Sequence, residues 1–323
     1  MSKEQLTIEG NTIHPGEHKS QVIRIARLPS GHDIEIYAHI FRGQLPGPCI
    51  LLLGGLHGDE VNGIEIVRRM VTGTMFKGLN CGSIIAIPLL NVYGFINFSR
   101  DLLDGKDVNR SFPGNFKGSL ASRIARTVTK KIMPEVDLLI DFHTGGSSRY
   151  NYPQIRHSSN DEQSLALAKI FGAPCTLVKD PISRSLRQFC FKEEISCLVY
   201  EGGQSLHLDE YSITEAISGV ERILLSFAMI DGETKQKNCF YFEKASWIRA
   251  QVSGIFKSFK KSGQLTEMNE LIGELYDPYG LKKTEVRANR DGFILAHNNS
   301  PVVHQGDALF NIGYQWEDYK SEV

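Results

Sequence analysis

Short runs of hydrophobic residues alternate with segments of helical spacing through the first two thirds of the chain. Apolar and polar residues alternate in 21–28 and 33–41, which predicts two antiparallel edge strands joined by a tight turn. Residues 48–55 form a continuous apolar run that ends in paired glycines, typical of a buried central strand. In 59–71 apolar residues recur near helical spacing, and acidic residues stand in the first turn, where they suit the helix dipole. Together with the strand 48–55, this predicts a strand, tight turn and helix.

The same alternation continues and indicates the fold class. The pattern predicts further strands at 83–91, 136–143, 175–178 and 197–201, and helices at 119–132, 160–171, 183–194 and 209–230. A loop rich in glycine, aspartate and asparagine fills 91–114, and loops of this length usually carry function. We therefore expect an α/β domain with a mixed sheet flanked by helices.

The pattern of residues changes after the last predicted helix. Short strand-like stretches separated by glycine, asparagine and proline replace the alternation, and a polar, lysine-rich segment precedes them. The sequence therefore predicts two domains, an α/β domain over 1–234 and a smaller all-β domain over 235–323.

Composition limits the partners that we expect. The 36 lysines and arginines nearly balance the 37 aspartates and glutamates, so no global field attracts nucleic acid or an anionic membrane. The amino-terminal segment lacks an apolar signal core, and the longest apolar run is too short to span a bilayer, which favours a cytoplasmic protein. The six scattered cysteines form no metal-binding pair and are interpreted as buried small side chains.

Candidate metal ligands follow several of the predicted strands. His57 and Glu60 follow the strand 48–55, and His143 and Glu201 end two others. Two ligands three residues apart and one distant histidine make the three-ligand pattern of catalytic zinc, which leaves one position for water. The His57 and Glu60 spacing alone is weak evidence, because a histidine at a strand end more often bonds to backbone.

Five separated motifs extend this pattern in the same order along the chain. They are GGLHGDEVNG, the asparagine of LLNVYGF, SRDLLDGKDVNRSFPG, LLIDFHTGG and YEGG. Together they resemble the succinylglutamate desuccinylase and aspartoacylase family, a branch of the zinc carboxypeptidase-like hydrolases. The resemblance covers nearly the whole chain, because members of this family also carry a small carboxyl-terminal β domain.

The resemblance implies one zinc ion per chain, held by His57, Glu60 and His143. Asp59 is a competing carboxylate, but the family's spacing selects Glu60. Asp141 precedes His143 on the same predicted strand, and it either orients a ligand or makes a capping or turn contact. The sequence leaves these two roles open.

The resemblance also implies roles for four residues in catalysis and substrate binding. Glu201 matches the family's general base, and Arg100 matches the residue that stabilises negative charge on the carbonyl oxygen. Asn109 and Arg110 match the pair that holds a substrate carboxylate, to which a planar guanidinium is well suited.

These roles predict hydrolysis of a small N-acyl amino acid to a carboxylate and a free amine. Two alternatives stay open: a zinc carboxypeptidase that acts on short peptides, and a zinc-binding module without catalysis. The carboxyl-terminal domain is interpreted as a lid or a contact in a homo-oligomer, because no lysine suited to a biotinyl or lipoyl carrier occurs between Lys283 and Lys320. The layout is closer to the family's bacterial deacylases than to mammalian aspartoacylase.

Overall fold

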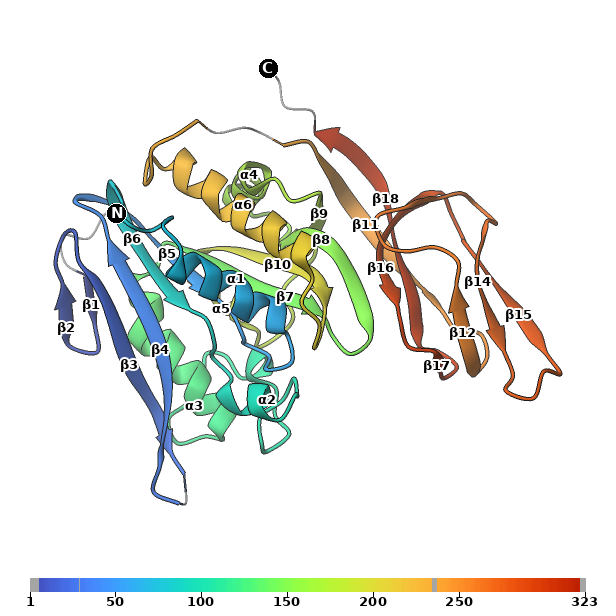
Figure 1. Ribbon diagram of the computed structural model, residues 1–323, viewed down its shortest axis with the longest axis horizontal. Coiled ribbons are helices and arrows are strands. Elements are labelled where there is room, and N and C mark those ends of the chain that lie inside the picture. Colours follow the sequence, from blue (N-terminus) through green and yellow to red (C-terminus); the bar gives the residue numbers. More distant parts are fainter. Residues whose placement is uncertain (1–5, 29, 234–236, 320–323) are drawn as a thin grey trace.

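The computed structural model describes residues 6–28, 30–233 and 237–319 (Figure 1). A 12-stranded mixed sheet runs through the molecule, and its central strands β6, β5, β7 and β10 are parallel. From one edge the first strands are β3 (His18–Arg27), β4 (Asp33–Arg42), β6 (Cys81–Ile87), β5 (Leu45–Leu53), β7 (Leu138–Gly145), β10 (Ser196–Gln204) and β8 (Arg149–His157). A separate pair is formed by β1 (Leu6–Ile8) and β2 (Asn11–Ile13).

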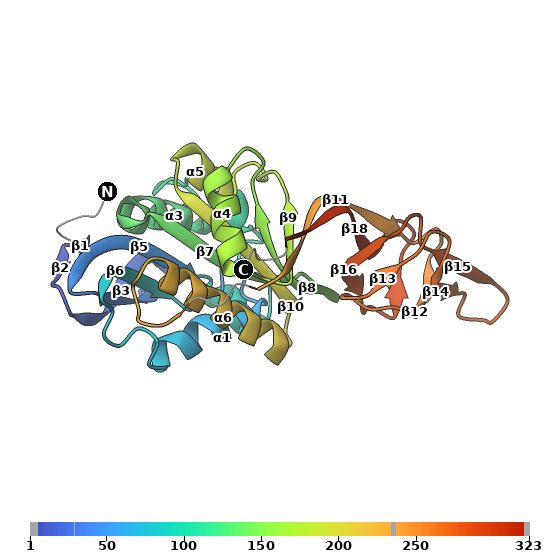
Figure 2. The same cartoon turned by 90° about the horizontal axis from the view of Figure 1, so that it is seen from above.

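Helices cover both faces of these central strands. They are α1 (Val61–Thr72), α2 (Val92–Ile96), α3 (Leu120–Thr127), α4 (Glu162–Phe171), α5 (Leu186–Lys192) and α6 (Glu210–Ser226). Figure 2 shows α1 and α6 on one side of the sheet and α3 and α5 on the other. None of the helices in the described ranges has the length and apolar character needed to cross a membrane.

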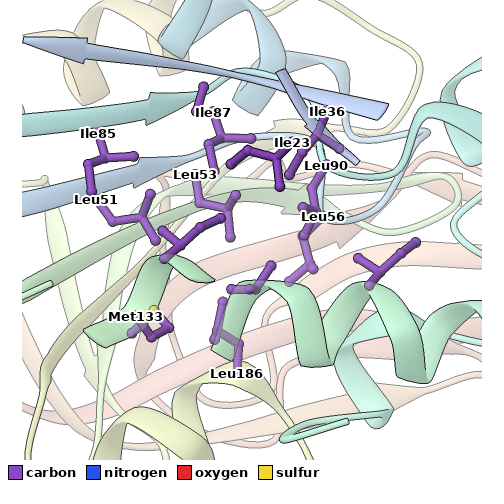
Figure 3. Packing of buried hydrophobic residues seen from close by; sticks show 14 of the residues in the cluster. Ile23, Ile36, Leu51, Leu53, Leu56, Ile85, Ile87, Leu90, Met133 and Leu186 are labelled. Carbon is purple, nitrogen blue, oxygen red and sulfur yellow. The ribbon is translucent and has the colours of Figure 1, made fainter. Parts of the chain in front are cut away.

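The continuous apolar strands supply a core on each face of the sheet. Leu51 and Leu53 of β5 pack toward α3 and α5, where Leu186 joins them (Figure 3). Ile50 and Leu52 point to the opposite face and pack with α1, α4 and α6. Because successive side chains on a strand leave opposite faces, a strand covered on both sides must be apolar throughout.

Strands joined by turns and loops fill residues 239–319, and no helix occurs in this range. The large sheet continues through β9 (Cys175–Val178), β11 (Cys239–Arg249), β18 (Ala308–Tyr319), β16 (Gly292–Asn298) and β13 (Leu265–Thr266). A four-stranded sheet packs beside it and contains β15 (Lys283–Arg287), β14 (Leu271–Tyr276), β12 (Gly254–Ser258) and β17 (Val302–Val303). The predicted domain boundary near 235 lies outside the described residues, and the division into two domains stays a prediction.

Several predicted elements differ from the observed ones. The helix predicted over 119–132 is α-helical only to Thr127 and continues as a π-helical turn. Strand β8 was not predicted at all, because it contains several polar residues and Pro153. Its ladder with β10 shifts register between Asn151 and Gln154, and Pro153 falls within that shift. Proline has no backbone N–H to donate, and here it lies where the ladder is already irregular. The regular pairs from Gln154 to Arg156 are therefore kept.

Close packing of α1 on β7 depends on Gly63. A Cβ atom at this position would overlap the carbonyl oxygen of Phe142. We expect Gly63→Ala to lower the free energy of unfolding by about 1–3 kcal/mol, the usual cost of overpacking. Urea unfolding measures this change. Thr72→Ala, at an exposed position of the same helix, should change stability by less than about 0.5 kcal/mol, and equal stability of the two variants would contradict the explanation.

Candidate metal centre and substrate cavity

The candidate metal centre lies where three neighbouring strands end. His57 follows β5, His143 lies on β7 and Glu201 lies on β10. His143 and Glu201 are register partners on adjacent parallel strands, so their side chains leave the same face of the sheet. Glu60 is the N-cap residue of α1, so it precedes the helix and does not lie in its first turn as the sequence pattern predicts.

The turn between His57 and Glu60 requires two backbone segments to approach closely. A Cβ atom at Gly58 would overlap the backbone of Gly94 and Phe95 in α2. Only glycine fits there, because it has no side chain. The turn then packs against α2, and His57 and Glu60 reach the same point.

The side chains of His57, Glu60 and His143 converge inside the protein. Nδ1 of His57 lies 2.8 Å from Oε1 of Glu60, and Nδ1 of His143 lies 2.7 Å from Oε2 of Glu60. The two Nδ1 atoms are 3.2 Å apart. All three residues are between 2% and 4% exposed, so solvent is excluded from most of this cluster.

Two further carboxylates orient the imidazole rings. Oδ2 of Asp141 lies 2.8 Å from Nε2 of His143, and Oδ1 of Asp107 lies 3.3 Å from Nε2 of His57. In a neutral ring each contact favours the proton on Nε2, so Nδ1 is the nitrogen that would offer a lone pair to a cation. Of the two roles that the sequence left open for Asp141, the observed contact is the one that orients a ring.

Opposite charges balance one another within the cluster. Burial raises the pKa of Glu60, but the charges of His57 and His143 outweigh it and hold that pKa well below its usual value. Burial lowers the pKa of His57, but the charge of Glu60 raises it above its usual value. For His143, the charges of Asp141 and Glu60 likewise overcome burial and raise the pKa well above normal. Glu60 is therefore ionised and offers a negative charge beside two ring nitrogens.

This donor set fits a zinc ion. Zinc binds imidazole nitrogen and carboxylate oxygen at about 2.0–2.2 Å, so three tetrahedral ligand atoms lie about 3.3 Å apart. The two Nδ1 atoms are 3.2 Å apart, and each lies within 2.8 Å of one oxygen of the Glu60 carboxylate, so a small outward shift would admit the ion. Within the described part of the chain, no other group of three such side chains has this geometry.

A cavity of about 270 Å³ opens onto the cluster. All of the site residues predicted from the sequence line it, namely His57, Glu60, Arg100, Asn109, Arg110, His143 and Glu201. Residues that lie far apart in the sequence are therefore brought to one cavity. The apolar part of the lining includes Ile182, Val199 and, from β11, Trp247.

Arg100 connects the long loop to the cluster. Its Nε and Nη2 donate to Oδ2 of Asp107 at 3.2 and 3.0 Å. Its Nη1 lies 3.3 Å from Oε1 of Glu60 and 3.2 Å from Nδ1 of His57. The guanidinium group therefore lies at the edge of the cluster, where it can approach an atom bound beside Glu60.

Asn109 and Arg110 lie farther out on the same loop. The Oδ1 of Asn109 accepts a hydrogen bond of 2.9 Å from the backbone of Leu186, which attaches the loop to α5. Nη1 of Arg110 donates to the carbonyl oxygen of Asn109 at 2.7 Å, and 41% of the Arg110 side chain is exposed. Arg110 is therefore an exposed side chain that lines the cavity.

The Glu201 carboxylate is held by two residues of β8. Nδ2 of Asn151 donates to Oε2 at 2.8 Å, and Nη1 of Arg156 donates to Oε1 at 2.7 Å. Glu201 is 9% exposed, and it lines the cavity together with both of these residues.

Sequence reasoning missed several polar residues of the site. Asn151, Arg149 and Arg156 lie on the unpredicted strand β8, so no pattern indicated them. Arg187 is 9% exposed, and its Nη1 has no hydrogen-bond partner among the described residues. Arg187 lies in the predicted helix 183–194, whose sequence SRSLRQFCFKEE contains several other polar residues, so no pattern singled it out.

The catalytic domain model of one protein family matches the chain. A model described as "Succinylglutamate desuccinylase/Aspartoacylase catalytic domain" matches residues 46–227, which is more than half of the chain. The N-alpha-acetyl-L-2,4-diaminobutyric acid deacetylase of Halomonas elongata is 26% identical over 307 residues, covering 88% of each protein.

Solved structures of similar proteins share the fold. The succinylglutamate desuccinylase/aspartoacylase from Rhodobacter sphaeroides superposes with a TM-score of 0.84 at 22% identity, covering 94% of this chain and 96% of the other. The product-bound ectoine utilization protein EutE (DoeB) from Ruegeria pomeroyi gives a TM-score of 0.85 at 21% identity, with coverages of 92% and 95%. Both similarities support the mixed α/β architecture.

The contact between Asp107 and His57 has a measurable consequence for metal affinity. We expect Asp107→Ala to weaken zinc binding about 10-fold to 100-fold, because the imidazole loses the group that orients it. Competition with a chromophoric chelator measures the dissociation constant. Asp104→Ala removes an exposed carboxylate from the same loop and should leave the affinity unchanged. Equal affinities of the two variants would refute the orienting role of Asp107.

Proposed function

Because the chain belongs to the succinylglutamate desuccinylase/aspartoacylase family, we propose that it is a zinc-dependent deacylase. Its substrate is a small N-acyl amino acid, whose amide bond it hydrolyses to a carboxylate and a free amine. The convergence of His57, Glu60 and His143 beside Glu201 in one cavity supports this proposal most directly. The proposed zinc-carboxypeptidase-like fold is consistent with a mixed sheet that carries helices on both faces.

In this proposal one zinc ion per chain is held by the three cluster residues. When bound, the ion would polarise the scissile carbonyl group and make a water molecule more acidic. Glu201 accepts a proton from the attacking water and later passes it to the leaving nitrogen. Arg100 stabilises the negative charge that develops on the carbonyl oxygen, because its guanidinium group lies beside Glu60 and His57.

The charge of the cavity supports an anionic substrate. Its arginines are Arg100, Arg110, Arg149, Arg156 and Arg187. The acidic residues that line the cavity are already engaged, because Glu60 and Asp141 contact the histidines and Glu201 contacts Arg156. Arg110, with Asn109 beside it, is therefore available to hold the carboxylate of the amino acid.

The size of the cavity supports a small substrate more than a peptide. A volume of about 270 Å³ lies just below the range of pockets that hold drug-sized ligands. We further propose that residues 235–323 form a smaller all-β domain that restricts the cavity, since Trp247 of β11 is part of the lining. The Halomonas relative is a deacetylase for N-acetylated diaminobutyric acid, which supports an N-acetyl group as one candidate acyl group.

A substrate panel tests the proposed function. We expect the zinc-loaded protein to release amine from N-acetyl or N-succinyl amino acids and not from blocked dipeptides, as measured by derivatisation of primary amines. Zinc at one equivalent per chain is expected by mass spectrometry of the native protein. Hydrolysis of the dipeptides alone would favour a carboxypeptidase, and bound zinc without any turnover would favour a binding module.

The Glu201→Gln variant tests the role of the general base. We expect turnover to fall about 100-fold to 10,000-fold while zinc stays bound, because an amide cannot accept the proton. Initial rates and metal analysis on the same sample measure the two effects. Glu221→Gln, an exposed residue of α6, serves as the matched control and should keep full activity. Retained activity in Glu201→Gln would show that another group is the base.

The Arg110→Lys variant tests recognition of the substrate carboxylate. Lysine keeps the positive charge but cannot form two parallel hydrogen bonds. We therefore expect KM to rise about 10-fold with a smaller effect on kcat, as measured by steady-state kinetics on the best substrate of the panel. Arg24→Lys, on the edge strand β3, makes the same exchange away from the cavity and should leave KM unchanged. An unchanged KM in Arg110→Lys would place the carboxylate elsewhere.

A further inference from the structure

Two side chains of β8 contact the carboxylate of Glu201 from different directions. We propose that Asn151 and Arg156 are positioning residues that hold this carboxylate in one orientation toward the metal cluster. The proposal rests on the function proposed above, in which Glu201 is the general base. Among the described residues, neither side chain forms a hydrogen bond with His57, Glu60 or His143, so both would act on the site through Glu201.

Each oxygen of the Glu201 carboxylate accepts a hydrogen bond from a different residue. Asn151 binds Oε2 at 2.8 Å, and Arg156 binds Oε1 at 2.7 Å. The last side-chain torsion of glutamate has a broad energy profile, so a free carboxylate would sample many orientations. Donors on both oxygens remove this freedom. One lone pair on each oxygen stays available, because a carboxylate can accept about four hydrogen bonds.

An irregularity in the strand pairing brings both donors to the same carboxylate. Asn151 and Arg156 are five residues apart, and in a regular strand they would leave opposite faces. Gln154 pairs with Glu201 and Asn151 pairs with Gly203, so β8 contains one more residue than β10 between these pairs. The extra residue reverses the alternation, and both side chains therefore reach Glu201. Such bulges commonly redirect side chains next to active sites.

The ion pair between Arg156 and Glu201 is poorly suited to a role in stability alone. The two side chains are 25% and 12% exposed, and desolvation offsets much of the attraction in pairs this buried. Nε of Arg156 is buried without a partner among the described residues, which adds a further cost. An arginine retained at this cost is better explained by the geometry that it imposes on Glu201.

Kinetics of substituted proteins test this proposal. We expect Arg156→Gln to lower kcat about 100-fold with little change in KM, because a misplaced base slows the proton transfer and leaves substrate binding intact. Arg156→Lys should recover part of the loss, since it restores one charged donor. Asn151→Ala should also lower kcat, and it keeps the test valid if Arg156→Gln fails to fold. Tyr152→Phe, on the same strand, retains both donors to Glu201 and should keep the wild-type kcat.

A double substitution separates positioning from direct substrate binding. In the inactive Glu201→Gln protein, calorimetry measures the dissociation constant of an N-acyl amino acid without turnover. We expect Arg156→Gln to leave this constant unchanged in that background, because its effect passes through Glu201. A tenfold or larger weakening would mean that Arg156 contacts the substrate, and it would overturn the proposal. Wild-type kcat in both Arg156→Gln and Asn151→Ala would overturn it as well.

Crystal structures give a readout that needs no activity. We expect the Glu201 carboxylate of Arg156→Gln to turn away from its wild-type orientation while His57, Glu60 and His143 keep theirs. An unmoved carboxylate would contradict the proposal. If the wild-type protein hydrolysed no N-acyl amino acid, the proposed function would fail, and these structures would still decide whether the two residues fix Glu201.

Discussion

Burial of the Glu60 carboxylate is the constraint on which the site depends. A charge that is 98% removed from solvent is tolerated only when opposite charges or polar donors surround it. His57 and His143 supply these donors, and Asp107 and Asp141 bind the far side of each ring. Acidic and imidazole side chains therefore alternate along a chain of contacts. The chain runs from Asp107 in the loop 91–114, through Glu60 at its centre, to Asp141 on β7. Glu60 and both imidazole rings are each held from two sides, so they can bind a cation with little rearrangement.

The arrangement of the sheet makes this cluster possible. Parallel strands end at one edge, and register pairing places Glu201 beside His143 without any contribution from loops. Gly63 lets α1 pack closely on β7 at Phe142, and this packing places Glu60 at the same edge of the sheet. Apolar packing on both faces of β5 and β7 then fixes these strands relative to each other. The chemistry is therefore positioned by the most buried part of the fold.

Sequence alone predicted the central strands and most helices, because these follow local periodicity. It also predicted seven of the residues that line the cavity, because these lie in ordered motifs. Strand β8 was missed, since Pro153 and its polar neighbours hide a strand whose pairing becomes evident only beside β10. Asp107 was missed for another reason. Asp101, Asp104 and Asp107 lie in the same loop, and only the folded loop shows which of them reaches His57. Contacts between segments distant in the chain carry information that local patterns lack.

The continuity of the large sheet limits how the wall of the cavity can move. Ala296 of β16 pairs with Asn151 of β8, the strand beside Glu201, and β11 pairs with β9, the next strand outward. A hinged opening of the wall that carries Trp247 would break several hydrogen bonds of these pairings together. The wall of the cavity that carries Trp247 is therefore part of the same hydrogen-bonded sheet as the strand that carries Glu201, and its shape is set by strand pairing.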